Sequence, residues 1–225
     1  MKTPATRLVL LALALTITGC GSLLAPQPDR SRFFVLSSGA KASSTAPGAS
    51  HLALGVGPVT IPDYLQRPGI ATRVGPTEVD YSQTDRWAEP LEECLPRVLA
   101  QDLSDSLGTS RVVMFPWAGD THVDYQVQVN VERFELTSQG QAVLAARWTI
   151  RNPQTGEILD SGEANESRRA GSDAASATAA LSQALDAMAR DLASRISQLS
   201  RKAGPSERKE SAATPASRLQ SAGID

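Results

Sequence analysis

The sequence is poor in the residues that build most metal, disulfide and stacking sites. Its 225 residues include two cysteines, two histidines, three tryptophans, three tyrosines and four phenylalanines. Two cysteines exclude a disulfide-dense scaffold and a zinc site with four sulfur ligands, and two histidines leave little room for a histidine-based metal cluster. So few aromatic rings also argue against a surface that stacks sugars or nucleic-acid bases.

Excess charge of one sign is missing as well. The chain carries 22 Lys and Arg against 24 Asp and Glu, a formal net charge of −2. Nucleic-acid-binding proteins usually present a strongly basic face, so we expect no nucleic-acid partner.

Recognised catalytic motifs are also absent from the sequence. It contains no G-x-S-x-G nucleophile motif, no P-loop and no dinucleotide-binding glycine pattern. His51 and His122 are far apart and are interpreted as ordinary loop or strand-edge residues. Asp102 and Asp105 are spaced like a carboxylate pair, but we interpret them as a solvated helix face. We therefore predict no catalytic residues, no metal site and no cofactor.

The N-terminus has the pattern of a bacterial lipoprotein signal. Two basic residues precede an apolar run over residues 8–17, which is too short to cross a bilayer. The I-T-G-C sequence at 17–20 then resembles the lipobox, in which the thiol is acylated and cleavage occurs before the cysteine. We predict that residues 1–19 are removed and that Cys20 carries the lipid. A buried N-terminal helix or an ordinary signal peptide with a chance cysteine is the alternative.

A lipid anchor has consequences for the compartment and for the second cysteine. Several acyl chains hold a protein stably on membrane lipids. With Cys20 acylated, Cys94 has no partner for a disulfide and is expected to be a small buried hydrophobic residue. Gly21 and Ser22 follow Cys20, without the aspartate that tends to retain lipoproteins in the inner membrane of enteric bacteria. That resemblance implies the periplasmic face of the outer membrane.

The mature chain divides into a tether, one domain and a tail. Residues 20–31 contain the lipidated cysteine and a proline-containing tether, whose eleven residues after Cys20 extend at most about 36 Å. Residues 32–200 carry the periodic apolar patterns of a folded domain. Residues 201–225 are polar without an apolar period and are expected to be a disordered tail.

Apolar periodicity predicts an α+β domain, in which a mainly antiparallel sheet packs against two main helices, the second long and C-terminal. Helices are expected over residues 87–107, closed by Gly108, and from Ser172-Asp173 to about residue 200. Pro96 leaves two alternatives for the first helix: a kink, or a start near Leu95. Strands are expected at 32–36, 52–56, 70–74, 77–81, 111–115, 124–136, 144–150 and from 158. The strand at 111–115 is expected to be buried, and the strand at 124–136 to carry a bulge near Glu132-Arg133.

Two stretches are denser in interaction-prone residues than a scaffold requires. The first, I-P-D-Y-L-Q-R-P at 61–68, is followed by Arg73. Its prolines suit an extended loop pinned by Tyr64 and Leu65, whereas Tyr64 and Arg67 are also residue types favoured at binding hot spots. The second stretch, R-W-A-E-P-L at 86–91, suits a helix start with a core tryptophan. Both the structural and the docking interpretations stay open.

These stretches, following a lipobox, resemble the ABC-type transport auxiliary lipoprotein family. Its best-known members belong to paraquat-inducible, Mce-type intermembrane transport systems. The resemblance covers roughly residues 30–200. It rests on Y-L-x-R-P at 64–68, Arg73, R-W-A-E-P-L at 86–91, D-Y-Q-V-Q-V at 124–129, the Trp148 strand and the terminal helix.

The resemblance implies a docking protein and not an enzyme. Its expected partners are an Mce-domain periplasmic protein and the inner-membrane permease and ATPase, which together move lipids between the membranes and maintain envelope integrity. Tyr64, Arg67 and Arg73 are the candidate partner-docking residues. A ring-like homo-oligomer would suit a tubular partner.

Other functions remain open from the sequence. The domain could carry a lipid itself in a groove between the sheet and the long helix, which would require a sizeable apolar cavity. It could also be an envelope-scaffolding lipoprotein without a transport role. An enzyme is the weakest alternative.

Overall fold

The computed structural model describes residues 28–39 and 49–203. The predicted signal peptide, Cys20 and the predicted tail beyond residue 203 lie outside these ranges, so their assignments remain predictions. No helix in the described part of the chain combines the length and apolar character needed to span a bilayer. All elements below belong to the unit that starts at Arg32.

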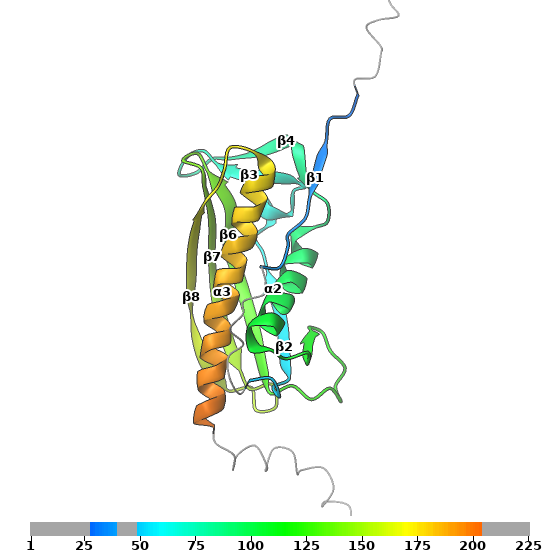
Figure 1. Cartoon of the computed structure of the whole chain (residues 1–225), viewed down its shortest axis with the longest axis vertical. Helices are drawn as coiled ribbons and strands as arrows, with labels where there is room; N and C mark the ends of the chain where they lie inside the picture. Colours follow the sequence, from blue (N-terminus) through cyan, green and yellow to red (C-terminus); the bar gives the residue numbers. More distant parts are fainter. Residues whose placement is uncertain (1–27, 40–48, 204–225) are drawn as a thin grey trace, which may run out of the picture. The chain divides into compact units, whose positions relative to one another are not determined.

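The domain has two layers, an eight-stranded sheet and two helices that cover one face of it (Figure 1). The strands are β1 (Arg32–Phe34), β2 (Leu54–Thr60), β3 (Gly69–Arg73), β4 (Val79–Trp87), β5 (Val112–Met114), β6 (Tyr125–Thr137), β7 (Gln141–Arg151) and β8 (Ile158–Arg169). The longest ladders, β6 with β7 and β7 with β8, are antiparallel, as is β3 with β4. Shorter parallel pairs join β1 to β4, β2 to β5, and β6 to both β2 and β3. The predicted α+β class with a mainly antiparallel sheet is confirmed.

Strand β6 is the central strand and changes register where the sequence predicts it. Its pairing with β7 shifts between Val131 and Arg133, which confirms the bulge. After the bulge, Phe134 is 1 % exposed and packs at the core against Trp87. Because side chains alternate along a strand, Glu135 lies on the opposite face from Phe134. The bulge therefore determines which face of the sheet receives this carboxylate.

Helix α2 (Leu91–Leu107) begins directly after Pro90 and contains Pro96. The expected start at residue 87, which is the last residue of β4, and the alternative start near Leu95 are therefore both wrong. Pro96 has no backbone N–H to donate, so one helical hydrogen bond is missing near the start of α2. The helix ends as predicted at Gly108, whose φ of 65° is the left-handed conformation that glycine adopts without strain.

Helix α3 (Ala174–Lys202) packs closely against the sheet. Leu181, Leu185 and Leu192 are each at most 1 % exposed, and Ala184 and Ala189 are fully buried. Small alanines alternating with leucines along this face bring the helix near the strands, so the interface is filled by side chains.

The 111–115 strand is not the buried strand that the sequence predicts. It forms β5, a three-residue edge strand that pairs with β2 alone among the described strands. Met114 is 47 % exposed and the following Phe115 is 51 % exposed. A short apolar run has no periodicity that separates a buried strand from an edge strand, which explains the error.

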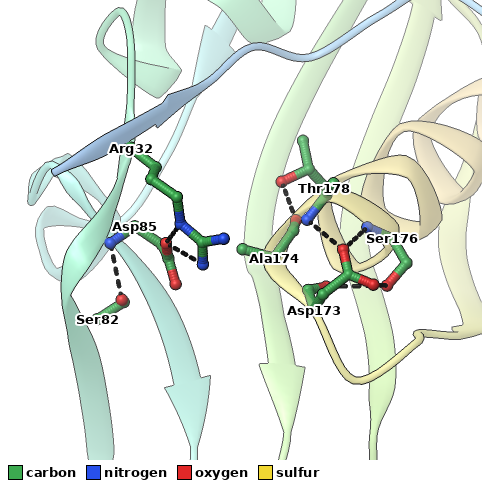
Figure 2. A network of polar contacts seen from close by, with 8 residues as sticks. Arg32, Ser82, Asp85, Asp173, Ala174, Ser176 and Thr178 are labelled. Carbon is green, nitrogen blue, oxygen red and sulfur yellow. Dashed lines mark hydrogen bonds and ion pairs between the residues drawn. The ribbon is translucent and has the colours of Figure 1, made fainter. Parts of the chain in front are cut away.

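Asp173 caps the N-terminus of α3 (Figure 2). Its carboxylate accepts hydrogen bonds from the backbone N–H groups of Ser176 and Ala175, both at 3.0 Å. The bonds from Ser176 are the main reason that the pKa of Asp173 lies below its ordinary value of 3.8. This carboxylate therefore satisfies N–H groups that have no partner within the helix.

We expect Asp173→Ala to lower the Tm of the domain by roughly 2–4 °C, because it removes the cap. Thermal unfolding followed by circular dichroism measures the change. Ser172→Ala is the matched control, since Ser172 is exposed and makes no cap bond with α3 in the described structure. Equal melting temperatures for both variants would contradict a capping role.

Candidate functional site

The loop at 61–68 is fixed to the domain from both sides. It contains the short 3₁₀ helix η2 (Asp63–Gln66), and Leu65 anchors it in the core at 2 % exposure. The Tyr64 hydroxyl donates to the backbone carbonyl of Glu132 at 3.2 Å. The Tyr81 hydroxyl in turn donates to the Tyr64 carbonyl at 3.0 Å. The backbone N–H of Trp87 donates to the Pro68 carbonyl at 2.7 Å, which ties the end of the loop to β4.

A buried carboxylate lies beneath this loop. The side chain of Glu135 has no exposed surface, and it pairs with Arg73 and Arg133, whose side chains are 25 % and 37 % exposed. Arg73 donates through Nε and through Nη2, the latter at 3.2 Å, and Arg133 donates through Nε at 2.8 Å. Burial opposes ionisation, but the bonds from Arg73 and Arg133 outweigh it and hold the pKa of Glu135 below its ordinary value of 4.5. Glu135 is therefore an anion at neutral pH.

Two arginine–tyrosine contacts extend this ion pair to the loop. The guanidinium carbon of Arg73 lies 5.9 Å from the centre of the Tyr64 ring. That of Arg67 lies 5.0 Å from the centre of the Tyr81 ring. Both distances are within the range of a cation–π contact. The three predicted docking residues, Tyr64, Arg67 and Arg73, thus belong to one cluster around Glu135 and Tyr81.

The cluster has the chemistry of a rigid recognition surface. Burial, reinforced by Glu135, raises the pKa of Tyr64 to about 12, so its hydroxyl stays neutral. No group of three or more His, Cys, Asp and Glu side chains in the described ranges could hold a metal ion. The buried members are paired with one another, whereas Asp63, Gln66 and Arg67 are exposed. The contacts therefore hold the loop in one ordered conformation with an exposed tip.

Three members of the cluster, Glu135, Arg133 and Tyr81, are not among the residues that the sequence patterns predict. Glu135 carries the one visible signal, because it is a charged residue placed between the apolar Phe134 and Leu136. A charge in such a run needs a partner if it is buried. The partner from β3, Arg73, is remote in sequence, so the pairing appears only in the folded sheet.

The interpretation of Asp102 as part of a solvated helix face is wrong. Asp102 is 2 % exposed, and its Oδ1 accepts hydrogen bonds from the Ser38 hydroxyl at 2.6 Å and the Gly39 N–H at 2.9 Å. Its Oδ2 is buried without a hydrogen-bond partner in the described structure. Burial raises the pKa of Asp102 to about 6, and the nearby carboxylates of Asp186 and Asp105 add to this rise. Asp102 holds the segment after β1 on α2.

Cys94 is the buried residue that the sequence predicts. It has no exposed surface and is a free cysteine. Burial raises the pKa of its thiol to about 12, so the reactive thiolate is not formed at neutral pH.

The family model for the ABC-type transport auxiliary lipoprotein component matches residues 34–193. The chain belongs to this family. It is therefore a lipoprotein component that is auxiliary to an ABC-type transport system. The resemblance drawn from the sequence is confirmed.

Solved structures share the fold of this lipoprotein. A DUF330-family protein from Xanthomonas campestris is 18 % identical with a TM-score of 0.63, and the match covers 76 % of this chain and 98 % of that one. An uncharacterized protein is 20 % identical with a TM-score of 0.59, covering 74 % of this chain and 98 % of that one. No curated protein sequence matches the chain.

Proposed function

We propose that this lipoprotein is the outer-membrane docking component of an Mce-type ABC transport system that moves lipids between the inner and outer membranes. Acyl chains on Cys20 hold the domain at the periplasmic face of the outer membrane. The loop at 61–68 receives an Mce-domain periplasmic protein, whose inner-membrane permease and ATPase complete the system. The role is non-enzymatic and maintains the envelope.

The observation that supports docking is the fixed loop with an exposed tip. Ion pairs and ring contacts around Glu135 immobilise its base, and Arg67 remains exposed above Tyr81. Binding to a loop that is already ordered avoids the entropy cost of ordering it. Arginine is also a residue type that is enriched at the hot spots of protein interfaces.

The packing between sheet and helix disfavours the alternative in which the domain carries a lipid. A groove there would be lined by Leu181, Leu185, Leu192 and Ile196, and each of these is at most 1 % exposed. A lipid tail would have to displace a packed core. The scaffolding alternative differs from docking in its partners, because a scaffold without a transport role binds no Mce-domain protein.

We expect Arg67→Glu to weaken binding of the Mce-domain protein about tenfold or more, because it reverses the charge at the loop tip. The measurement is the amount of Mce-domain protein recovered when full-length lipidated protein is purified from envelope extracts. Arg169→Glu, an equal charge change at an exposed position on the edge strand β8, is the control and should recover partner like wild type.

Thermal unfolding of both variants shows whether the domain is intact. A folded Arg67→Glu variant that recovers as much partner as wild type would exclude the loop as the docking site. Wild-type protein that recovers no Mce-domain partner would favour the scaffolding function instead.

A further inference from the structure

Strand β1 and the residue after it, Val35, present bulky apolar side chains to solvent. Phe33 is 62 % exposed and Val35 is 57 % exposed, whereas the alternate residues Phe34 and Leu36 face the core, Leu36 at 4 % exposure. Both sides of this segment are therefore apolar, which a solvated edge strand does not require. Its outward side is therefore suited to an apolar environment.

The position of β1 at the edge of the sheet leaves Phe33 and Val35 exposed to solvent. The strand lies at an edge of the sheet and pairs in parallel with β4, with Phe33 opposite Arg86 (Figure 1). Arg32 has a side chain that is 60 % exposed and forms an ion pair with Asp85 at 2.7 Å (Figure 2). Exposed apolar side chains beside a long basic one are typical of segments at a membrane interface.

The short chain between Cys20 and β1 favours membrane lipid, and not a partner protein, as the contact of Phe33 and Val35. Phe33 follows Cys20 by thirteen residues, so the chain between them spans at most about 43 Å. Strand β1 is the first element of the domain after the anchor. A specific protein interface buries about 800 Å² per partner, more than two side chains supply, whereas a lipid leaflet needs no complementary shape.

We propose that Phe33 and Val35 insert into the lipid leaflet that holds the Cys20 anchor, so that β1 is the membrane-facing edge of the domain. This inference rests on the anchored state proposed above. It also places the docking loop near the leaflet, because the backbone carbonyls of Phe34 and Pro68 accept hydrogen bonds from the adjacent residues Ala88 and Trp87. A partner that binds the loop would then meet the protein close to the membrane surface.

Spin labels on the full-length lipidated protein test the orientation. Single cysteines are introduced as Phe33→Cys, Val35→Cys and, as a matched control, Ile158→Cys, and the protein is reconstituted in phosphatidylethanolamine–phosphatidylglycerol vesicles. Ile158 is apolar and 64 % exposed, but it begins β8, at the opposite edge of the sheet from β1. The buried Cys94 does not compete for the label.

We expect labels at positions 33 and 35 to lose collisions with a water-soluble nickel reagent and to gain collisions with oxygen, which concentrates in the bilayer. The label at 158 should remain accessible to nickel. A label at 33 that is as accessible to nickel as the label at 158, in vesicle-bound protein, would overturn the inference and leave the anchor intact. Protection at 33 that appears only when the Mce-domain protein is added would overturn it in favour of a protein contact. Protein that does not stay with the vesicles would overturn the inference together with the anchor.

Discussion

Replacing Asp102 with asparagine is expected to raise the free energy of unfolding at neutral pH by about 2 to 3 kcal/mol. The buried carboxyl has a pKa of about 6 in the folded chain against an ordinary value of 3.8. The folded state therefore binds the proton more tightly than the unfolded state. The stability that this gives is fully present below pH 3.8 and is lost as the pH rises through about 6. Asparagine keeps an oxygen that can accept the bonds from Ser38 and Gly39, and it carries no charge.

Urea unfolding from acidic to neutral pH measures this effect. The free energy of unfolding of the wild-type protein should fall as the pH rises from acidic to neutral. That of Asp102→Asn should fall much less. The charged groups facing Asp102 remain in both proteins: Asp105 on α2, and Asp186 with its ion-pair partner Arg190 on α3. Asp105→Asn is the control: it removes a carboxylate that only adds to the rise in the pKa of Asp102, so most of the wild-type pH dependence should remain. If the free energy of unfolding of Asp102→Asn fell with pH as steeply as that of wild type, another group would be responsible for the pH dependence.

Replacing Glu135 with alanine is expected to lower the free energy of unfolding by about 2 to 3 kcal/mol and to weaken partner binding. The carboxylate is fully buried between Arg73 and Arg133, so its removal leaves two like charges facing each other. Water reaches both arginines in part, which keeps the loss below that of a wholly buried pair. The cluster beneath the docking loop would also lose its centre.

Urea unfolding compares Glu135→Ala with Glu132→Ala. Glu132 is on the same strand and pairs with Arg147, but its side chain is 42 % exposed, so its loss should change the stability by about 0.5 kcal/mol or less. The folded pKa of Glu135 is depressed below 4.5, so its contribution is present above that pH and is lost as the pH falls further. Equal stability of the two variants would show that the buried ion pair does not hold the loop base.

The two carboxylates contribute to stability with opposite signs, and that difference comes from their partners. Asp102 meets only a hydroxyl and a backbone N–H, and other carboxylates lie near it. Glu135 meets two guanidinium groups. Burial raises the pKa of both acids, and only the charged donors around Glu135 reverse the effect.

The sequence by itself determined the features that depend on short stretches of chain. The α3 stripe, the Asp173 cap, the Gly108 helix end and the bulge near Arg133 all follow from spacing within a few residues. The family follows from the order of the motifs around 64–68 and 86–91, and the model match over 34–193 confirms it. The lipid anchor on Cys20 is likewise a sequence prediction.

Only the tertiary structure decided which side chains from different elements contact one another. Asp102 and Asp105 are aspartates three residues apart on the same helix, yet Asp102 is buried where Ser38 contacts it, and this burial raises its pKa although the hydrogen bond from Ser38 opposes the rise. Glu135 becomes the centre of the candidate site because Arg73 arrives from another strand. Periodicity along one element reports which side of it is apolar, but the burial and charge of a side chain depend on neighbours that are distant in sequence.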